Sequence, residues 1–414
     1  MGKALMKHDK SLAALVVNYN TGAYALACID SLIQEWEIAG RERAKLNIIL
    51  VDNASPEDQE LWLVQIEERG VEVIRSGENL GYAAGLNACY EASKKNPCDA
   101  VAYLNPDLVF LPGSITALMD YIFDHPDVGA IDPDACIDAL GTFRLPRNHL
   151  PTPLEHIRLT LAYMSPFFAR LYSRLRFRNT MEWWTAKHPI ETDMLSGCCV
   201  FLRREVVEEL GQAMDPRYPL YFEDTDLFRT LRAKGYKIVH HPKARILHHW
   251  SRSAKIGSPD NPEPNEKFEV SRQAYYEKFF SPFGRKLVAW MDRFVSRWPP
   301  EKLHRPLLAM KDLGELEGPL ELELPHSCRF LIEFAVHPVF PLCCGVFGEG
   351  DRWVCPAESW EWFFPLPYFG RVIDLDTGRV LFGMKFHKTG GFRTEAMSMA
   401  ELDSLGERLL SRSA

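Results

Sequence analysis

The sequence lacks the cysteine spacing of a disulfide framework or a zinc ribbon. Its ten cysteines include no C-x-x-C pair, and two pairs are adjacent, Cys198-Cys199 and Cys343-Cys344. We therefore expect buried free thiols in a reducing compartment. A metal held by the C-terminal cysteines together with His326 and His337 is the minor alternative.

Long apolar runs and an excess of positive charge are also missing. The run SLAALVV at 11–17 is too short to cross a membrane and is expected to be a buried strand, not a signal peptide. Lys and Arg number 48 against 56 Asp and Glu, which gives a net charge of −8. This balance argues against a general nucleic-acid binder. We expect a cytoplasmic protein.

No internal repeat or low-complexity tract occurs in the 414 residues, a length that corresponds to about two or three domains. With 46% hydrophobic and 25% charged residues the composition is that of a globular protein. Changes in composition predict a first domain over 1–255, a linker and helical extension over 256–319, and a β-rich region over 320–414.

The first third of the chain alternates short β-branched runs with helical patterns. Strands are predicted over 12–17, 46–51, 71–75 and 100–104, and helices over 24–37, 56–69, 82–94 and 113–123, the second with Ser55 as its N-cap. This order predicts an α/β fold with a mostly parallel sheet flanked by helices on both faces. Ligands bind such sheets beyond the carboxyl ends of the strands, where polar clusters occur at 18–20, 52–53 and 105–107.

Two of these positions suit a nucleotide. A carboxylate at Asp52 can accept a hydrogen bond from N3–H of uracil or thymine, a proton that cytosine lacks, although Asp52 alone more often caps the next helix. The small residues of the loop at 79–85 allow a nucleotide close to the backbone, and the helix that follows favours phosphate at its N-terminus. A plain loop-to-helix turn is the alternative.

Acidic residues and a histidine provide the remaining candidates. Asp107, in Asn105-Pro106-Asp107, can hold Mg²⁺ or Mn²⁺, although this tripeptide is also an ordinary turn. The carboxylates of 223–226 repel one another, which raises a pKa and makes a base, or they only complement a helix dipole. His248, at the end of the strand 244–247, is either a metal ligand or a structural histidine.

Taken in order, these motifs resemble the family 2 glycosyltransferases of the GT-A fold, especially their rhamnosyltransferase-like branch. The resemblance covers roughly 11–285 and rests on VVNYN (16–20), VDNAS (51–55), NLGYAAGLN (79–87), LNPDLVF (104–110), MLSGCCVFLRR (194–204), YFEDTDL (221–227), HHWSRS (248–253) and YYEKFFSPFGR (275–285). It implies a Rossmann-like sheet flanked by helices, followed by a helical extension and the small C-terminal β-rich region.

The resemblance also implies roles for single residues. It makes Asp224 the catalytic base with Glu223 beside it, and it makes Asp107 and His248 ligands of Mg²⁺ or Mn²⁺. Donor-binding positions are Asn18, Asn20, Asp52, Asn79, Gly81 and Asn105, and acceptor-binding positions are Asp226, Gly197 and Trp250. Asn105 stands where many relatives have Asp, which leaves fewer charged metal ligands.

The implied activity is inverting transfer of a sugar in cell-surface polysaccharide synthesis. The first candidate for this sugar is L-rhamnose, transferred from dTDP-rhamnose. The donor is a dTDP or UDP sugar, and the acceptor is a hydroxyl of a glycan or a lipid-linked saccharide. A decayed carbohydrate-binding protein and a sugar-nucleotide hydrolase or nucleotidylyltransferase are the rivals. A nucleotidylyltransferase would need a basic N-terminal loop to bind a triphosphate, and residues 18–22 contain no Lys or Arg.

Two segments carry further hypotheses. The segment 143–180 has seven arginines and a single acid, Glu155, and its interleaved apolar residues predict contact with the inner face of a membrane or an anionic lipid-linked acceptor. A packed helix with a solvated face is equally compatible. Strands are predicted over 330–334, 339–347, 371–375 and 380–386, with a hairpin turn at 376–378. The aromatic residues around them form a sugar-binding surface, a core, or a surface that packs against the first domain or a second subunit. The sequence is also compatible with a homo-oligomer.

Overall fold

The computed structural model describes residues 10–249, 263–299, 303, 305–398, 400–402 and 404–405. The chain forms two compact units. The first consists of 1–135, 186–279 and 395–414, and the second of 136–185 and 280–394. The arginine-rich segment 143–180 therefore shares a unit with the β-rich residues after 320. The domain boundaries at 255 and 319 stay predictions.

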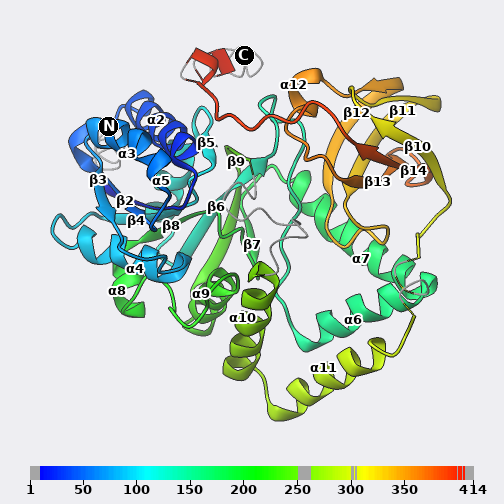
Figure 1. The fold of residues 1–414 in the computed structure, drawn as a ribbon, viewed down its shortest axis with the longest axis horizontal. Coiled ribbons are helices and arrows are strands. Elements are labelled where there is room, and N and C mark those ends of the chain that lie inside the picture. Colours follow the sequence, from blue (N-terminus) through cyan, green and yellow to red (C-terminus); the bar gives the residue numbers. More distant parts are fainter. Residues whose placement is uncertain are drawn as a thin grey trace. The chain divides into compact units, whose positions relative to one another are not determined.

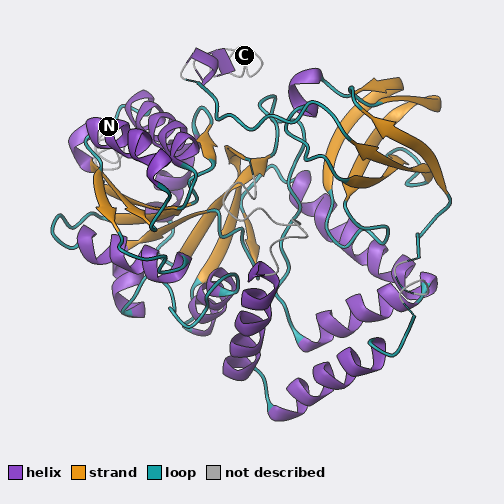
Figure 2. Ribbon diagram, viewed as in Figure 1, coloured by secondary structure: helices purple, strands orange, loops and turns teal. Residues whose placement is uncertain are grey.

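A nine-stranded sheet forms the centre of the first unit (Figures 1 and 2). Its order is β3-β2-β1-β4-β8-β6-β9-β5, and β7 pairs with β9. The strands are β1 (Leu12–Asn18), β2 (Leu46–Asp52), β3 (Glu72–Arg75), β4 (Ala100–Leu104), β5 (Leu108–Phe110), β6 (Val128–Cys136), β7 (Ile190–Thr192), β8 (Cys199–Arg203) and β9 (Lys237–His248). The first four in chain order run parallel, whereas β8 runs antiparallel to β4 and β9 to β5.

Helices cover both faces of this sheet, as the alternating pattern predicted. Helices α2, α3 and α5 lie on one face, and α4, α8 and α9 lie on the other (Figure 1). The helices are α2 (Gly22–Ile38), α3 (Glu60–Glu68), α4 (Tyr82–Ser93), α5 (Ser114–Asp124), α8 (Arg204–Leu210), α9 (Glu223–Ala233) and α10 (Glu263–Phe279).

The start of α3 differs from the prediction. A 3₁₀ turn, Glu57–Gln59, precedes it, and Gln59 rather than Ser55 is its N-cap residue. The Ser55 hydroxyl instead accepts a hydrogen bond from the backbone N–H of Asn20 at 2.8 Å. Ser55 therefore ties the end of β1 to the end of β2 and does not cap a helix.

A five-stranded sheet in the order β10-β14-β13-β11-β12 defines the second unit (Figure 2). Its strands are β10 (Met310–Leu316), β11 (Glu321–Ala335), β12 (Cys344–Val354), β13 (Pro367–Asp374) and β14 (Val380–Lys388). Its helices are α6 (Pro153–Met164), α7 (Pro166–Trp184), α11 (Pro282–Val295) and the short α12 (Ala357–Trp360). The predicted strand 339–347 begins only at Cys344, and β10 was not predicted.

The hairpin turn predicted at 376–378 is present between β13 and β14. Asp374 and Arg379 pair through their backbones, and Gly378 has a φ of +70° that favours glycine. One Asp374 carboxylate oxygen accepts from the backbone N–H groups of Asp376 and Thr377. His326, and not His337, lies near Cys328 and Asp374, with the three ligand atoms within 4.8 Å of one another.

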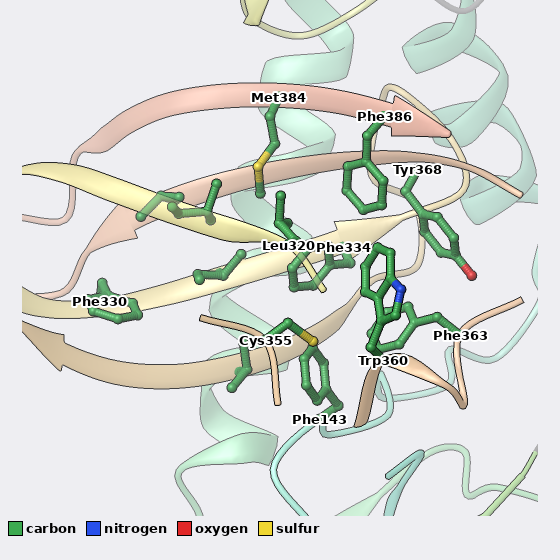
Figure 3. Close-up of a cluster of buried hydrophobic side chains, with 14 of the residues drawn as sticks. Phe143, Leu320, Phe330, Phe334, Cys355, Trp360, Phe363, Tyr368, Met384 and Phe386 are labelled. Atoms are coloured by element: carbon green, nitrogen blue, oxygen red, sulfur yellow. The ribbon is translucent and has the colours of Figure 1, made fainter. Parts of the chain in front are cut away.

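The aromatic residues of the C-terminal region form the core of the second unit. Trp360, Phe363 and Tyr368 pack with Phe334 and Phe386 inside the sheet (Figure 3). Because these rings are buried, they are not available to stack on a sugar. Of the interpretations of this region, the structure favours a core for these side chains.

Deleting 320–414 is expected to make the remaining chain aggregate. Phe143 from before α6 is buried in the core of Figure 3, and Ala162, Ala169 and Tyr172 pack against residues between 307 and 343. Removing the sheet exposes these apolar faces to water. Light scattering of the purified 1–319 fragment would measure the effect. A monomeric fragment with unchanged helix content would show instead that the helices fold without the sheet.

The cysteines are all free, and all but the half-buried Cys344 are buried. This confirms the expectation of buried thiols. Within the described part of the chain, no helix is long and apolar enough to cross a membrane.

Candidate active site

The carboxyl ends of β1 and β2 meet at a fixed carboxylate. Asn18 lies opposite Asp52 in the parallel register, and its Nδ2 donates to Asp52 Oδ1 at 2.8 Å. Thr21 Oγ1 donates to Asn18 Oδ1 at 2.8 Å and so orients the amide. The backbone N–H of Ser55 donates to Asp52 Oδ2 at 3.0 Å. Asp52 is thus buried and held by two donors.

A pocket of about 530 Å³ opens beside this carboxylate. Its lining includes Asp52, Ser55, Pro56, Leu63, Arg75 and Ser76. The volume lies in the usual range for small-molecule sites, which is about 300–1,000 Å³. Arg75 is fixed there by Glu60 and Glu67, each at 2.7 Å. Asn20 is exposed at the end of β1, with a φ of +56°.

The loop before α4 is held by a residue that the sequence analysis gave no role. Buried Asn53 donates through Nδ2 to Asn79 Oδ1 and to the Gly81 carbonyl, both at 3.1 Å. Its Oδ1 accepts from the Leu80 N–H at 2.9 Å. Gly81 has a φ of +80° and immediately precedes α4. The sequence did contain a signal for this role of Asn53, because a side-chain amide directly follows Asp52 at the end of a buried strand.

Asp107 and His248 come together although they lie far apart in the sequence. Strand β5 pairs antiparallel with β9, and this places His248 Nε2 3.4 Å from Asp107 Oδ1. The Asn105 amide lies 3.5 Å from the same ring nitrogen. Burial alone would lower the pKa of His248, but Cys198 and Asp107 raise it well above its ordinary value. Burial opposes ionisation of Asp107, yet His248 lowers the pKa of this carboxyl below its usual range.

These residues fit a divalent cation. A buried carboxylate oxygen and an imidazole nitrogen converge from neighbouring strands, and an amide lies beside them. The raised pKa of His248 reflects a place where positive charge is favoured, which is what a cation requires. Oxygen and imidazole donors are ligands that Mn²⁺ and Mg²⁺ sites use.

Glu223 and Asp224 form an acidic pair at the start of α9. Two residues with left-handed backbone, Tyr221 at φ +65° and Phe222 at φ +70°, precede the pair and aim it. Burial raises the pKa of both carboxyls, and the charge of Asp224 adds to the effect on Glu223. The Thr225 N–H donates to Asp224 Oδ1 at 2.6 Å. The pair therefore resembles the raised-pKa base that the sequence predicted.

Tyr82 completes this acidic end of the site. Its buried hydroxyl and Glu223 Oε2 have no hydrogen-bond partner among the described residues. Burial and the nearby Glu223 and Asp224 carboxylates raise the pKa of Tyr82 well above its ordinary value. Buried polar atoms without partners are uncommon in folded proteins. Sequence reasoning missed Tyr82 because a tyrosine at a helix start carries no specific signal.

One loop joins the acidic pair to the Asp107–His248 pair. A Cβ added to Gly197 would lie 2.5 Å from Asp224 Oδ2, so the backbone touches this carboxylate. The next residue, Cys198, accepts from the Asn105 N–H through its carbonyl at 2.8 Å. The preceding Ser196 N–H donates to Asp132 Oδ2 at 2.9 Å. The loop 196–198 therefore fixes the acidic pair and the Asp107–His248 pair relative to each other.

The other two predicted acceptor positions differ from Gly197. Asp226 accepts from the Tyr218 hydroxyl at 3.0 Å and pairs with Lys278 of α10 at 2.7 Å. Lys278 also binds Asp215 at 2.9 Å. Asp226 thus anchors α10. Trp250 lies outside the described residues.

Replacing Gly197 by alanine is expected to slow catalysis. The added methyl group collides with Asp224 and must displace the carboxylate. We expect kcat to fall by about 10-fold or more, since a small misplacement of a reacting group is costly. Steady-state kinetics would measure it. Gly318→Ala, where the methyl group meets open space, is the matched control. Equal rates for the two variants would show that the close approach has no role.

Residues 14–211 match the family Glycosyl transferase family 2. The chain has a mixed parallel and antiparallel sheet flanked by helices, and a second, small β sheet. This is the GT-A-type architecture predicted from the resemblance. The chain is 28% identical over 254 residues to the N-acetylglucosaminyl-diphospho-decaprenol L-rhamnosyltransferase of Mycobacterium tuberculosis, covering 58% of this chain and 77% of that protein. It is 25% identical over 202 residues to the O-antigen biosynthesis protein RfbC of Myxococcus xanthus, covering 44% of this chain and 13% of that protein.

Solved structures resemble the chain more distantly. The mannosyltransferase PcManGT from Pyrobaculum calidifontis, in complex with GDP-Man and Mn²⁺, is 15% identical with a TM-score of 0.39, covering 71% of this chain and 77% of its own. TarS 1-349 of S. aureus, in complex with UDP-GlcNAc, is 13% identical with a TM-score of 0.42, covering 69% and 73%.

Proposed function

We propose that this chain is a metal-dependent inverting glycosyltransferase that moves a sugar from a nucleotide-diphospho-sugar to a hydroxyl group. The observation that carries the proposal is the loop 196–198, which contacts the acidic pair through Gly197 and the Asp107–His248 site through Cys198. A base and a leaving-group site therefore lie on either side of one short segment. The proposed donor is a dTDP or UDP sugar, and the first candidate is dTDP-rhamnose, from which L-rhamnose would be transferred.

The donor would bind at the ends of β1 and β2. Asp52 accepts the N3–H of the base in the adjoining pocket, and Asn18 keeps the carboxylate in place. The loop of Asn79 and Gly81, held by Asn53, and the exposed Asn20 border the sugar-phosphate part. Asn105 lies toward the diphosphate. The protein groups in these roles are neutral or anionic. The negative charge of the diphosphate would therefore be balanced by the bound cation.

The reaction would proceed by a single displacement. Asp224 takes the proton of the acceptor hydroxyl while its oxygen bonds to the anomeric carbon. The bond from that carbon to the diphosphate oxygen breaks on the opposite face, which inverts the centre. Burial raises the pKa of both carboxyls, and the charge of Asp224 raises that of Glu223 further. Gly197 would border the acceptor.

Asp107 and His248, with Asn105 beside them, would hold Mg²⁺ or Mn²⁺. When bound, such an ion offsets the charge that develops on the departing nucleotide diphosphate. The acceptor would be a glycan or a lipid-linked saccharide in cell-surface polysaccharide synthesis. The name of the mycobacterial relative gives N-acetylglucosaminyl-diphospho-decaprenol, which supports a lipid-linked acceptor. We place this work in the cytoplasm, at the inner face of a membrane.

Nucleotide selectivity tests the donor site. We expect dTDP and UDP to bind more tightly than CDP in calorimetric titrations with Mn²⁺, by about 10-fold or more, because a charged hydrogen bond contributes roughly 1.5–3 kcal/mol. Asp52→Asn removes this preference, whereas Asp58→Asn, an exposed acid in the following turn, keeps it. Equal affinity of the wild type for CDP would overturn the assignment of Asp52.

A further inference from the structure

We propose that the second unit docks on an anionic membrane surface through the exposed faces of α7 and α11. The proposed surface, called here the docking face, consists of Phe167, Phe168, Arg170, Leu171 and Arg174 of α7, and of Phe283, Lys286, Trp290, Arg293 and Phe294 of α11. The inference does not depend on the donor or on the reaction, because it concerns a different unit of the chain.

Helix α11 separates an aromatic, basic side from a buried side. Phe283 and Trp290 are 77% and 57% exposed, and Lys286 and Arg293 lie between and beyond them at helical spacing. On the other side Val288 and Met291 are buried, and the helix packs against α6. Exposed apolar side chains that cluster and are bordered by polar residues are typical of an interaction site, unlike single exposed ones. Because Lys286 and Arg293 alternate with these aromatic side chains, the expected partner is both apolar and anionic.

The acid of α11 is not on this exposed side. Asp292 is half-buried, and its Oδ1 lies 2.7 Å from His156 Nε2 of α6. The charge that α11 presents at its most exposed positions is therefore positive. An anionic surface complements it, whereas an anionic groove on another protein would have to accept protruding aromatic rings as well.

The same combination occurs at the start of α7. Phe167 and Leu171 are 69% and 59% exposed, and Arg170 and Arg174 are exposed beside them. The opposite side is packed, since Ala169, Tyr172 and Ser173 are buried. A buried arginine, Arg371 of β13, donates to Ser173 Oγ at 2.8 Å and fixes α7 on the sheet of its own unit.

Four of the seven arginines of 143–180 fall into two groups. Arg144 donates to the Trp184 carbonyl at 2.7 Å, and Arg176 pairs with Glu155 at 3.4 Å, so these two serve packing. Arg170 and Arg174 make no ion pair with a described residue. Between α7 and α11, helix α6 exposes Leu154 and Arg158. Glu182, near the end of α7, is an exposed acid outside the docking face.

A groove at the N-terminus of α7 offers a place for a lipid phosphate. It has a volume of about 780 Å³ and is lined by Arg170, Arg305 and Lys385 together with Pro166, Leu307 and Pro338. Lys385 is paired with Asp312 at 2.8 Å, which leaves the two guanidinium groups for a ligand. Guanidinium groups bind phosphate oxygens in pairs of hydrogen bonds. The neighbouring Phe167 and Leu171 would enter the interfacial region as this headgroup binds.

Vesicle co-sedimentation tests the docking face. We expect the full chain to bind phosphatidylglycerol vesicles at low salt and phosphatidylcholine vesicles at least about 10-fold more weakly, because each Lys or Arg near an anionic surface contributes about 1 kcal/mol. Phe167→Ser with Leu171→Ser, and Phe283→Ser with Trp290→Ser, should each reduce binding by about 10-fold or more. Arg170→Gln with Arg305→Gln should reduce binding and its dependence on salt.

The matched control is Ile38→Ser with Leu61→Ser, two side chains of the first unit that are 62% and 63% exposed. It should leave vesicle binding unchanged, and circular dichroism should give every variant the wild-type melting curve. Absence of binding to anionic vesicles would overturn the proposal, as would equal loss in the control. A dimer in sedimentation velocity that the aromatic variants dissociate, without vesicle binding, would make the face an interface between two copies. Calorimetric titration with dTDP tests the donor site separately.

Discussion

Asp224→Asn is expected to lower turnover by about 10²-fold or more while leaving donor affinity unchanged. A positioned general base typically contributes 10²–10⁴-fold, and asparagine has the shape of aspartate but does not accept the proton. The Thr225 N–H and the Gly197 backbone that contact Asp224 can still hold an amide. Turnover would be measured as nucleotide diphosphate released with acceptor present, and donor affinity by calorimetry.

The dependence on pH separates loss of the base from general damage. Because burial raises the pKa of Asp224, the wild-type rate should fall with decreasing pH at values above those at which an ordinary aspartate is protonated. Asp224→Asn should lose this acidic limb. Asp127→Asn, an exposed acid paired with Lys237, is the matched control and should keep both the rate and the limb. Near-wild-type transfer by Asp224→Asn would remove this residue from the mechanism.

Asp107→Ala is expected to abolish metal-dependent donor binding. The substitution removes the carboxylate that faces His248 at 3.4 Å and leaves a diphosphate without its countercharge. We expect nucleotide diphosphate release to fall by about 10²-fold or more, since a bound cation contributes several kcal/mol to a charged transition state.

Chelation provides the parallel test. EDTA should inactivate the wild type, and added Mn²⁺ should restore it, whereas neither treatment should change Asp107→Ala. Asp107→Asn keeps the side-chain volume in this buried site and controls for the cavity that alanine leaves. Full activity of the wild type in EDTA would show that the cations of the protein itself serve the leaving group.

The centre of the parallel half of the sheet was predictable because β1 and β4 are buried along their whole length and β2 along nearly all of it. Every residue of β1 is buried, and an apolar run of this length followed by Asn18 and a helical pattern has few other structures. The positions of Asn18 and Asp52 at the same edge follow from parallel pairing. For the same reason, the end of β4 correctly indicated where Asn105 lies.

The antiparallel half was not predictable in this way. The approach of Asp107 to His248 depends on the pairing of β5 with β9, two strands far apart in the chain. The contact between Gly197 and Asp224 depends on a loop whose path no periodicity records. The resemblance to a family suggested that these residues act together, but their spacing alone did not.

Aromatic density was ambiguous for a related reason. Trp360 and Phe363 lie in short segments between strands, where neither a period of two nor a helical period tells inside from outside. The register shift in β11 between Glu323 and Cys328 breaks the alternation further. Only the packing of Phe363 against Phe143 and Phe334, and of Trp360 against Phe386, shows that these rings are part of the core.

The most direct test of the proposed reaction is the configuration of its product. The full chain would be incubated with dTDP-rhamnose, Mn²⁺ and a lipid-linked saccharide acceptor, and the anomeric centre of the new glycoside read by NMR together with the dTDP released. The account predicts equal amounts of dTDP and of a glycoside with inverted configuration, both lost in Asp224→Asn. Free sugar in place of a glycoside in the presence of acceptor, or a glycoside with retained configuration, would contradict it.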